Sequence, residues 1–348
     1  MRSFEIAGRK ITQDGKPYVI AEIGNNHNGR VDLCKILIER AKANGADAVK
    51  LQKRSPASLF TCKLYNSPYE NENSFGPTYG AHREFLEFDH DQWVEIVDFA
   101  RKCDIPLFST AFDIESVEFL KRYDLPAWKV ASGCLKDVFL IESMAETKKP
   151  MIISTGGGDW EDVDRVYDLL EYRNIDFCFL HCVASYPNTA DKMNLATITS
   201  MLDRYEHTII GLSDHYPGNL MAETAYSLGA RVFEKHFTAN KSWQGPDHAL
   251  SMEPEDLHHL VHNLEKIKAS MGSGEKTMLH CEQKGIYKMG KGIYARHDIP
   301  MSAIITEDML CIKSPADGLP PYEIGNVIGK RAKLYLPAET PITMEVLK

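Results

Sequence analysis

The chain has 348 residues, of which 43% are hydrophobic and 26% charged, so it is long enough and apolar enough to fold around a large buried core. Acidic residues outnumber basic ones by 49 to 40, and no long basic run interrupts the mixture, which argues against nucleic acid as a partner. No apolar stretch reaches the roughly 18 to 20 residues of a membrane span or has the form of a signal peptide, so we expect no membrane partner and a cytoplasmic location.

Short apolar runs recur along most of the chain, from YVIAEIG at residues 18–24 to RVFEKHF at residues 231–237. Between these two lie DAVKLQ, PLFSTAF, AWKVASG, PMIISTGG, FCFLHCVASYP and TIIGLSDH. Helical periodicity fills the intervals, as in VDLCKILIERAKANGA, where Leu33, Leu37 and Ala41 share one face. Eight apolar strands that alternate with helices predict an α/β fold of the (β/α)8 TIM barrel type. The alternative is an open doubly wound sheet, which the strand count and the lack of a GxGxxG motif after the first strand disfavour.

The longest connection runs from about residue 54 to residue 89 and contains YNSPYENENSFGPTYG. Loops of this length are usually functional lids or disordered segments. Its aromatic residues, Phe60, Tyr65, Tyr69, Phe75 and Tyr79, argue against disorder.

The residue pattern changes near residues 272–285, where helical periodicity gives way to short apolar pairs rich in Pro and Gly. We therefore expect a catalytic barrel at residues 1–275, a linker at 276–288 and a small domain of short strands and turns at 289–348. The eight cysteines are scattered without CxxC pairs, and we interpret them as reduced thiols of the core.

Polar residues collect where the apolar runs end, and in a TIM barrel the active site lies at the carboxyl ends of the strands. In chain order they are Glu22, Lys50, Gln52, Ser109, Thr110, Lys129, Ser132, Ser154, Thr155, His181, Tyr186, Ser213, Asp214, His215, Glu234 and His236.

His215 and His236 end two strands that are neighbours in the predicted barrel. Period-two alternation places Ser213 with His215 on one strand face, and Glu234 with His236 on the next. The two histidines would then be close enough to share a divalent metal such as Mn, Zn, Co or Fe. The alternative is a pair of hydrogen-bonded histidines without metal.

Lys50 and Lys129 follow apolar residues in two further strands and would face the barrel mouth together with the serines. Two ammonium groups near hydroxyls and near the glycines of STGGGD suit a phosphate pocket. A Schiff-base lysine is the rival role, but an amine nucleophile works best isolated and desolvated, so two lysines favour charge neutralisation.

The ordered motifs AEIGNNHNG, ADAVKLQ, FSTAFD, KVASG, IISTGG, HCVASYP, GLSDH and EKHFT…GPDHALSMEP together resemble the sialic acid synthase family of nonulosonate synthases. The resemblance covers essentially the whole chain. Its C-terminal segment resembles the antifreeze-like SAF domain, of the β-clip type, that closes those enzymes.

The resemblance implies that the protein condenses phosphoenolpyruvate with an open-chain hexose of the N-acetylmannosamine type and releases phosphate. It also implies a divalent metal, Mn, and a homodimer in which the C-terminal domain of one subunit covers the barrel mouth of the other. The residues that match the family's catalytic positions are Glu22, His215 and His236, and the two histidines would hold the metal. Those for phosphoenolpyruvate are Lys50, Thr110, Lys129, Ser132, Ser154 and Ser213, and those for the sugar are Gln52, Tyr186 and Asp247.

The chain departs from the family pattern at three positions that bear on the acceptor sugar. Ser314, in KSPADG, stands where the family usually has an arginine, and Ala184 and Cys134 replace more polar residues. The acceptor therefore stays open between N-acetylmannosamine, mannose, mannose 6-phosphate and a modified acylamino hexose. A metal-dependent pyruvate aldolase and a catalytically silent sugar-binding protein are the remaining alternatives.

Overall fold

A computed structural model describes residues 3–348, and its first compact unit is a closed barrel of eight parallel strands. The strands are β3 (Tyr18–Gly24), β4 (Ala48–Lys53), β5 (Leu107–Ala111), β6 (Trp128–Val130), β7 (Met151–Ser154), β8 (Phe177–Cys182), β9 (Ile209–Asp214) and β10 (Val232–His236). Each strand pairs with the next in sequence, and β10 pairs with β3 to close the ring. All eight predicted apolar runs are therefore barrel strands, and the predicted (β/α)8 fold is confirmed.

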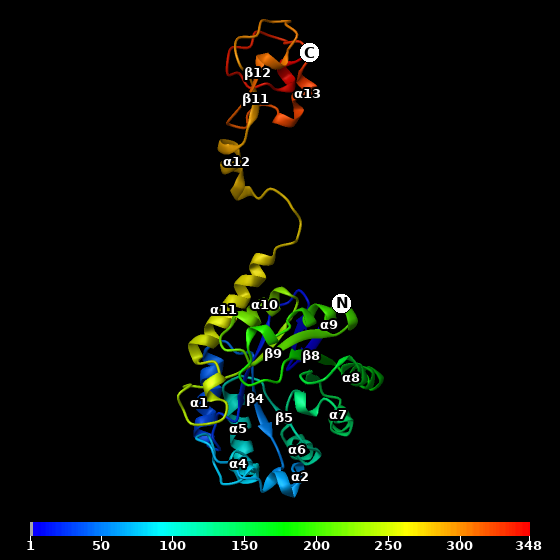
Figure 1. The fold of residues 1–348 in the computed structure, drawn as a ribbon, viewed down its shortest axis with the longest axis vertical. Helices are drawn as coiled ribbons and strands as arrows, with labels where there is room; N and C mark the ends of the chain where they lie inside the picture. Colours follow the sequence, from blue (N-terminus) through cyan, green and yellow to red (C-terminus); the bar gives the residue numbers. More distant parts are fainter. Residues whose placement is uncertain (1–2) are drawn as a thin grey trace. The chain divides into compact units, whose positions relative to one another are not determined.

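Helices surround the barrel on the outside (Figure 1). They are α1 (Val31–Ala43), α5 (His90–Lys102), α6 (Ile114–Leu120), α7 (Val138–Ala145), α8 (Trp160–Tyr172), α9 (Ala196–Arg204), α10 (Leu220–Ser227) and α11 (Pro254–Met271). Their apolar faces pack against the outward-facing residues of the strands in one large core. In α11 the buried positions are Leu257, Leu260 and Leu264, as the helical periodicity of this segment predicts.

The long connection after β4 folds into the short helices α2 (Pro56–Leu59), α3 (Cys62–Tyr65) and α4 (Tyr79–Phe85). Its aromatic rings pack on one another, since Tyr79 lies 5.0 Å from Phe60 and 5.4 Å from Tyr69 between ring centroids. The connection is therefore an ordered segment, as its aromatic content predicts.

A hairpin at the amino end closes the bottom of the barrel. Its strands β1 (Ser3–Ile6) and β2 (Arg9–Thr12) pair antiparallel. Phe4, Ile6 and Ile11 are buried in one cluster with inward-facing strand residues such as Ile20 and Phe108. Sequence analysis did not predict this hairpin. Because it fills the amino end of the barrel, open space is left at the carboxyl end.

Gly211 lets β9 lie close to its neighbours, and this leads to a stability prediction. A Cβ atom at Gly211 would come within 2.2 Å of the Val232 carbonyl oxygen and 2.5 Å of Leu180 Cδ2. We expect Gly211→Ala to lower the free energy of unfolding by about 1 to 3 kcal/mol, because overpacked cores lose this much. Urea denaturation of Gly211→Ala and Gly133→Ala tests this, since a Cβ at Gly133 meets nothing within 4 Å. Equal stability of the two variants would contradict the prediction.

The second compact unit spans Ser273–Lys348, whereas the first spans Met1–Gly272. It contains α12 (Gln283–Met289), the antiparallel strands β11 (Gly292–Ala295) and β12 (Leu310–Lys313), and α13 (Ile324–Val327). Isolated bridges such as Ile299 to Leu336 extend the pairing, and both residues belong to this unit's own buried core. A small domain of short strands and turns is therefore present, whereas the finer division at 275 and 288 stays a prediction.

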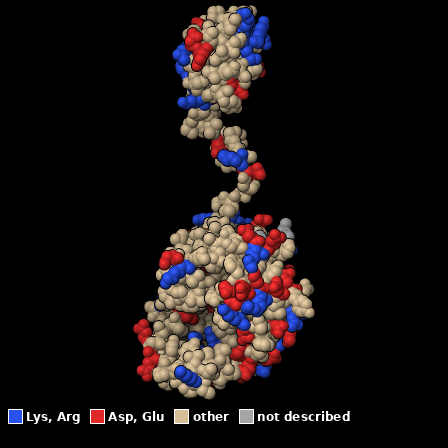
Figure 2. Space-filling model, turned by 45° about the vertical axis from the view of Figure 1, so that its right-hand side comes forward, with Lys and Arg blue, Asp and Glu red and all other residues tan. Residues whose placement is uncertain are grey.

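Two features of the surface agree with the composition. On the face drawn in Figure 2, basic and acidic side chains are interleaved over the barrel unit, without a continuous basic area. Among the helices of residues 3–348, none has the length and apolar character that a membrane span requires.

The cysteines are free, as expected, but Cys62 and Cys281 are exposed, so the interpretation of all eight as core thiols is wrong for these two.

Candidate active site

A cavity of about 430 Å³ opens at the carboxyl ends of the barrel strands. The residues that match the family's site positions all line this cavity: Glu22, Lys50, Gln52, Thr110, Lys129, Ser132, Ser154, Tyr186, Ser213, His215, His236 and Asp247. Four other polar residues expected at the strand ends, Ser109, Thr155, His181 and Asp214, are not part of its lining; His181 bonds instead to the Met193 carbonyl oxygen and Asp214 to Lys235. The structure therefore brings most of the strand-end residues together, although geometry alone does not test the role of each residue. Glu234 and Asn25 also line the cavity, together with Arg54, Arg83 and Phe112.

Strand register explains why these side chains meet. Glu22 lies opposite Lys50 on β4 and opposite His236 on β10. Thr110 likewise lies opposite Lys129, and Glu234 opposite Ser213. Since side chains at every second position of a strand face the same side, paired positions at strand ends form a layer across the barrel.

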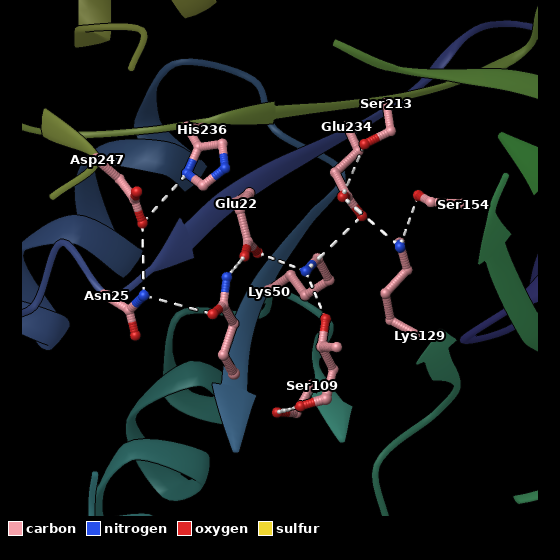
Figure 3. Close-up of polar contacts among 12 residues, drawn as sticks. Glu22, Asn25, Lys50, Ser109, Lys129, Ser154, Ser213, Glu234, His236 and Asp247 are labelled. Carbon is pink, nitrogen blue, oxygen red and sulfur yellow. Dashed lines mark hydrogen bonds and ion pairs between the residues drawn. The ribbon is translucent and has the colours of Figure 1, made fainter. Parts of the chain in front are cut away.

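Two buried lysines share one buried glutamate at the bottom of the cavity (Figure 3). Glu234 lies 3.9 Å from Lys50 Nζ and 3.8 Å from Lys129 Nζ. Lys50 is also 2.8 Å from a Glu22 carboxylate oxygen and donates to Thr110 Oγ1 at 2.7 Å. These partners compensate the cost of burying the charges, which would be several kcal/mol for an unpaired ion.

Lys129 Nζ donates to Ser154 Oγ at 2.7 Å and to the Val130 carbonyl oxygen at 2.8 Å. Burial lowers the pKa of Lys129, while the Glu234 carboxylate acts in the opposite direction. Burial also tends to raise the pKa of Glu234, but the positive charges of Lys129 and Lys50 outweigh it and hold this pKa below its usual range. Glu234 is therefore held as an anion beside both lysines.

His215 and His236 lie on the side of the cavity formed by β9 and β10, with ring centroids 5.5 Å apart. Burial and the neighbouring His236 lower the pKa of His215 to about 3, so this imidazole is neutral near pH 7. In the described part of the chain, buried His236 Nδ1 has no hydrogen-bond partner, and its closest acidic neighbour is Asp247 Oδ2 at 3.9 Å. A neutral imidazole and an unpartnered ring nitrogen in one cavity are the donor set that a divalent metal uses.

The fit to a metal is limited to these two nitrogen ligands. Residues 3–348 contain no group of three or more His, Cys, Asp or Glu side chains placed to hold a metal ion. Solvent or substrate would therefore complete the coordination shell, which is the arrangement of a catalytic rather than a structural metal site.

A chain of polar contacts continues from Lys50 to Asp247 along one wall of the cavity, and its contacts are drawn in Figure 3. Gln52 donates to Glu22 Oε1 at 2.6 Å, and Asn25 donates to Gln52 Oε1 and to Asp247 Oδ2, at 3.4 Å each. Tyr186 covers the other wall, with its ring centroid 4.2 Å from that of His215. Amide, carboxylate and phenol groups of this kind suit the hydroxyl groups of a sugar.

Sequence reasoning missed Arg54 and Arg83. Arg54 directly follows β4, stacks over Phe112 with its guanidinium carbon 3.7 Å from the ring centroid, and donates to Gln52 Oε1 at 2.6 Å. Arg83 comes from α4 in the long connection. Arg54 could have been predicted as a site residue, because it follows Lys50 and Gln52 at the same two-residue spacing. No local pattern indicates that α4 returns to the cavity.

Fold and site together define a TIM barrel of the enzyme type, whose cavity brings two buried lysines together with two histidines. Comparison with known proteins specifies the class. The NeuB family model matches residues 37–276, and the SAF domain model matches residues 290–348. The chain belongs to the NeuB family, the sialic acid synthase family, and carries a C-terminal SAF domain.

The relatives agree along nearly the whole length. Human N-acetylneuraminate-9-phosphate synthase is 36% identical, with 98% of this chain and 95% of the human protein covered. N,N'-diacetyllegionaminic acid synthase of Campylobacter jejuni is 34% identical, with 91% of this chain and 96% of that protein covered. The crystal structure of N-acetylneuraminic acid synthetase from Leptospira borgpetersenii is similar at a TM-score of 0.72 and 28% identity, covering 82% of this chain and 95% of that one. The chain is thus a synthase-type enzyme, and its relatives differ in the sugar acid they make.

Proposed function

We propose that the protein condenses phosphoenolpyruvate with the open-chain form of an acylamino hexose of the N-acetylmannosamine type and releases phosphate. The observation that carries this proposal is the pair of buried lysines in one cavity with two histidines. The lysines suit the two anionic groups of phosphoenolpyruvate, and the histidines suit a site for activating an aldehyde.

Phosphoenolpyruvate is proposed to bind at the bottom of the cavity. Lys50 and Lys129 would face its carboxylate and phosphate, and the hydroxyls of Thr110, Ser132, Ser154 and Ser213 would supply further donors. Lys129 has the hydrogen-bond partners of an ammonium group, because it donates to two oxygens and lies near Glu234. This supports charge neutralisation rather than the Schiff base that a pyruvate aldolase would need.

The bond-forming step joins carbon 3 of phosphoenolpyruvate to the aldehyde carbon of the sugar. Water then adds at carbon 2, and the tetrahedral product loses inorganic phosphate to leave a 2-keto acid. A divalent metal, which we propose to be Mn, would be held by His215 and His236 and would supply Lewis acidity to the aldehyde. Glu22, which faces both His236 and Lys50 across the strands, would move protons to and from the water and the new hydroxyl.

The sugar is proposed to lie above phosphoenolpyruvate, against Gln52, Tyr186 and Asp247. All three line the same cavity, and Gln52 is bonded directly to Glu22. Ala184 also lines the cavity, so one of the departures from the family pattern is in reach of the acceptor. We also propose a homodimer with a swapped C-terminal domain, which the family resemblance implies, and a cytoplasmic location, which the residue pattern of the sequence favours. Light scattering after size-exclusion chromatography would test the dimer.

The proposal predicts phosphate release that depends on both a sugar and a metal. We expect turnover with phosphoenolpyruvate, Mn and one sugar of a panel of N-acetylmannosamine, its 6-phosphate, mannose, mannose 6-phosphate and a diamino-trideoxy hexose. A chelator should stop it, and Mn should restore it. Mass spectrometry of the product should show the sugar extended by three carbons. Turnover of pyruvate without phosphate release would favour the aldolase, and binding of a sugar without turnover would favour the silent binding protein.

A further inference from the structure

Arg54 and Arg83 bring positive charge to the cavity that no carboxylate neutralises directly. Within residues 3–348, neither guanidinium group forms an ion pair, although both line the cavity. Glu87, near Arg54, is already bound by Lys53 Nζ at 2.8 Å and by the Arg54 backbone N–H at 3.1 Å. Asp247, the other carboxylate nearby, faces Asn25 and His236.

Arg54 is held in place with most of its donors unused. Its side chain is buried, and the stacking on Phe112 together with the hydrogen bond to Gln52 fixes the plane of the guanidinium. Arg83 lines the same cavity, and burial together with the charge of Arg83 lowers the pKa of Arg54 to about 10. Arg83 Nε is buried and has no hydrogen-bond partner among the described residues. Two guanidinium groups that line one cavity and have unused donors match the oxygens of a doubly charged phosphate monoester.

The position of Arg54, directly after β4, indicates which substrate would carry this phosphate. Lys50, Gln52 and Arg54 follow one another at alternate positions, so Arg54 lies about 13 Å beyond Lys50 at a strand rise of about 3.3 Å per residue. Gln52 lies between them and donates to Glu22. An open-chain hexose whose aldehyde lies near Glu22 and His236 would therefore extend from the lysine level toward the arginine level.

We propose that Arg54 and Arg83 bind a phosphate group at the far end of the acceptor sugar, an inference that rests on the proposed condensation. The enzyme then uses a hexose 6-phosphate, and its product retains that phosphate at the end remote from the new carboxylate. A sugar kinase or an isomerase of sugar phosphates must supply such an acceptor, and a phosphatase must act on the product if the free acid is needed.

The binding test uses mannitol 6-phosphate, which has an open chain and a phosphate but no aldehyde. It is titrated calorimetrically into protein saturated with phosphoenolpyruvate, so that the lysine level is occupied. We expect it to bind more tightly than mannitol, and we expect Arg54→Met and Arg83→Met each to weaken its binding on the order of 10-fold to 100-fold, the usual effect of losing a charged hydrogen bond. Arg54→Lys should keep part of the affinity.

The matched control is Arg122→Met, because Arg122 also stacks over a phenyl ring, that of Phe119, but is exposed and outside the cavity lining. It should bind mannitol 6-phosphate like the unmodified protein. Circular dichroism and the Tm of each variant confirm folding. Equal affinity for mannitol and its 6-phosphate, or a phosphate preference that survives Arg54→Met and Arg83→Met, would overturn the proposal.

Turnover separates this inference from the function on which it rests. In kcat/KM, the preference for N-acetylmannosamine 6-phosphate or mannose 6-phosphate over the same free sugar should fall at least about tenfold in Arg54→Met. Turnover of free sugars without such a preference would overturn the arginine subsite and leave the condensation standing. Arginine-dependent binding of mannitol 6-phosphate without turnover of any sugar would overturn the condensation and leave the subsite standing.

Discussion

Alanine at His215 or at His236 is expected to reduce phosphate release from phosphoenolpyruvate by about three orders of magnitude, because a Lewis acid contributes several kcal/mol to such a transition state. The reason lies in the geometry. The two rings are 5.5 Å apart in one cavity, and the low pKa of His215 keeps its nitrogen lone pair available. Each variant should also lose affinity for Mn, which calorimetry or electron paramagnetic resonance measures without any turnover.

His262→Ala is the control for these variants, because His262 lies on the exposed face of α11, where it stacks on His258 away from the cavity. It should retain both Mn binding and phosphate release. Loss of turnover without loss of Mn affinity in His215→Ala and His236→Ala would show that the histidines act on substrate directly. Full turnover in either variant would show that the metal assignment is wrong.

Lys235→Met is expected to lower the free energy of unfolding by about 3 to 5 kcal/mol, the usual cost of removing one partner from a buried ion pair. Lys235 and Asp214 lie directly opposite each other on β10 and β9, with Nζ and Oδ2 2.6 Å apart. Both side chains are at most 3% exposed. The substitution leaves the Asp214 carboxylate buried without its charged partner, so the folded state is destabilised.

The comparison for this prediction is Lys241→Met. Lys241 pairs with Asp256 at the same distance of 2.6 Å, but the two side chains are 43% and 36% exposed. An exposed pair contributes about 0 to 1 kcal/mol, so this variant should be nearly as stable as the unmodified protein. Urea denaturation in the presence of a chelator removes any contribution of bound metal. Similar losses in both variants would contradict the assignment of the large effect to burial.

The barrel could be predicted because each of its strands can be recognised from the residues of that strand alone. Strands such as Ile209–Asp214 and Val232–His236 are continuous apolar runs that end in polar residues, and both faces of these strands are buried. The amino-terminal hairpin was missed because Phe4, Ile6 and Ile11 are too few to form a clear pattern. The role of these three residues is visible only in the folded protein, where they pack against the inward-facing residues at the amino end of the closed barrel.

The site was predictable where a residue's role follows from its place at the end of a strand. Lys50 and Lys129 are of this kind, and so are the two histidines. Contacts between residues that are far apart in the sequence could not be predicted. That Glu234 lies between both lysines depends on the closure of the barrel, and that Arg83 joins Arg54 depends on the path of the long connection. Neither the period of a strand nor that of a helix records such contacts.

The position of Glu234 has a consequence for the lifetime of the bound product. This carboxylate supplies negative charge to Lys50 and Lys129 from within the wall, so phosphate that departs leaves the two ammonium groups with an anionic neighbour. The same carboxylate competes with free inorganic phosphate for the lysines. Under the proposed condensation, an internal counter-ion would therefore shorten the residence of the leaving group and protect the enzyme from inhibition by its own phosphate product.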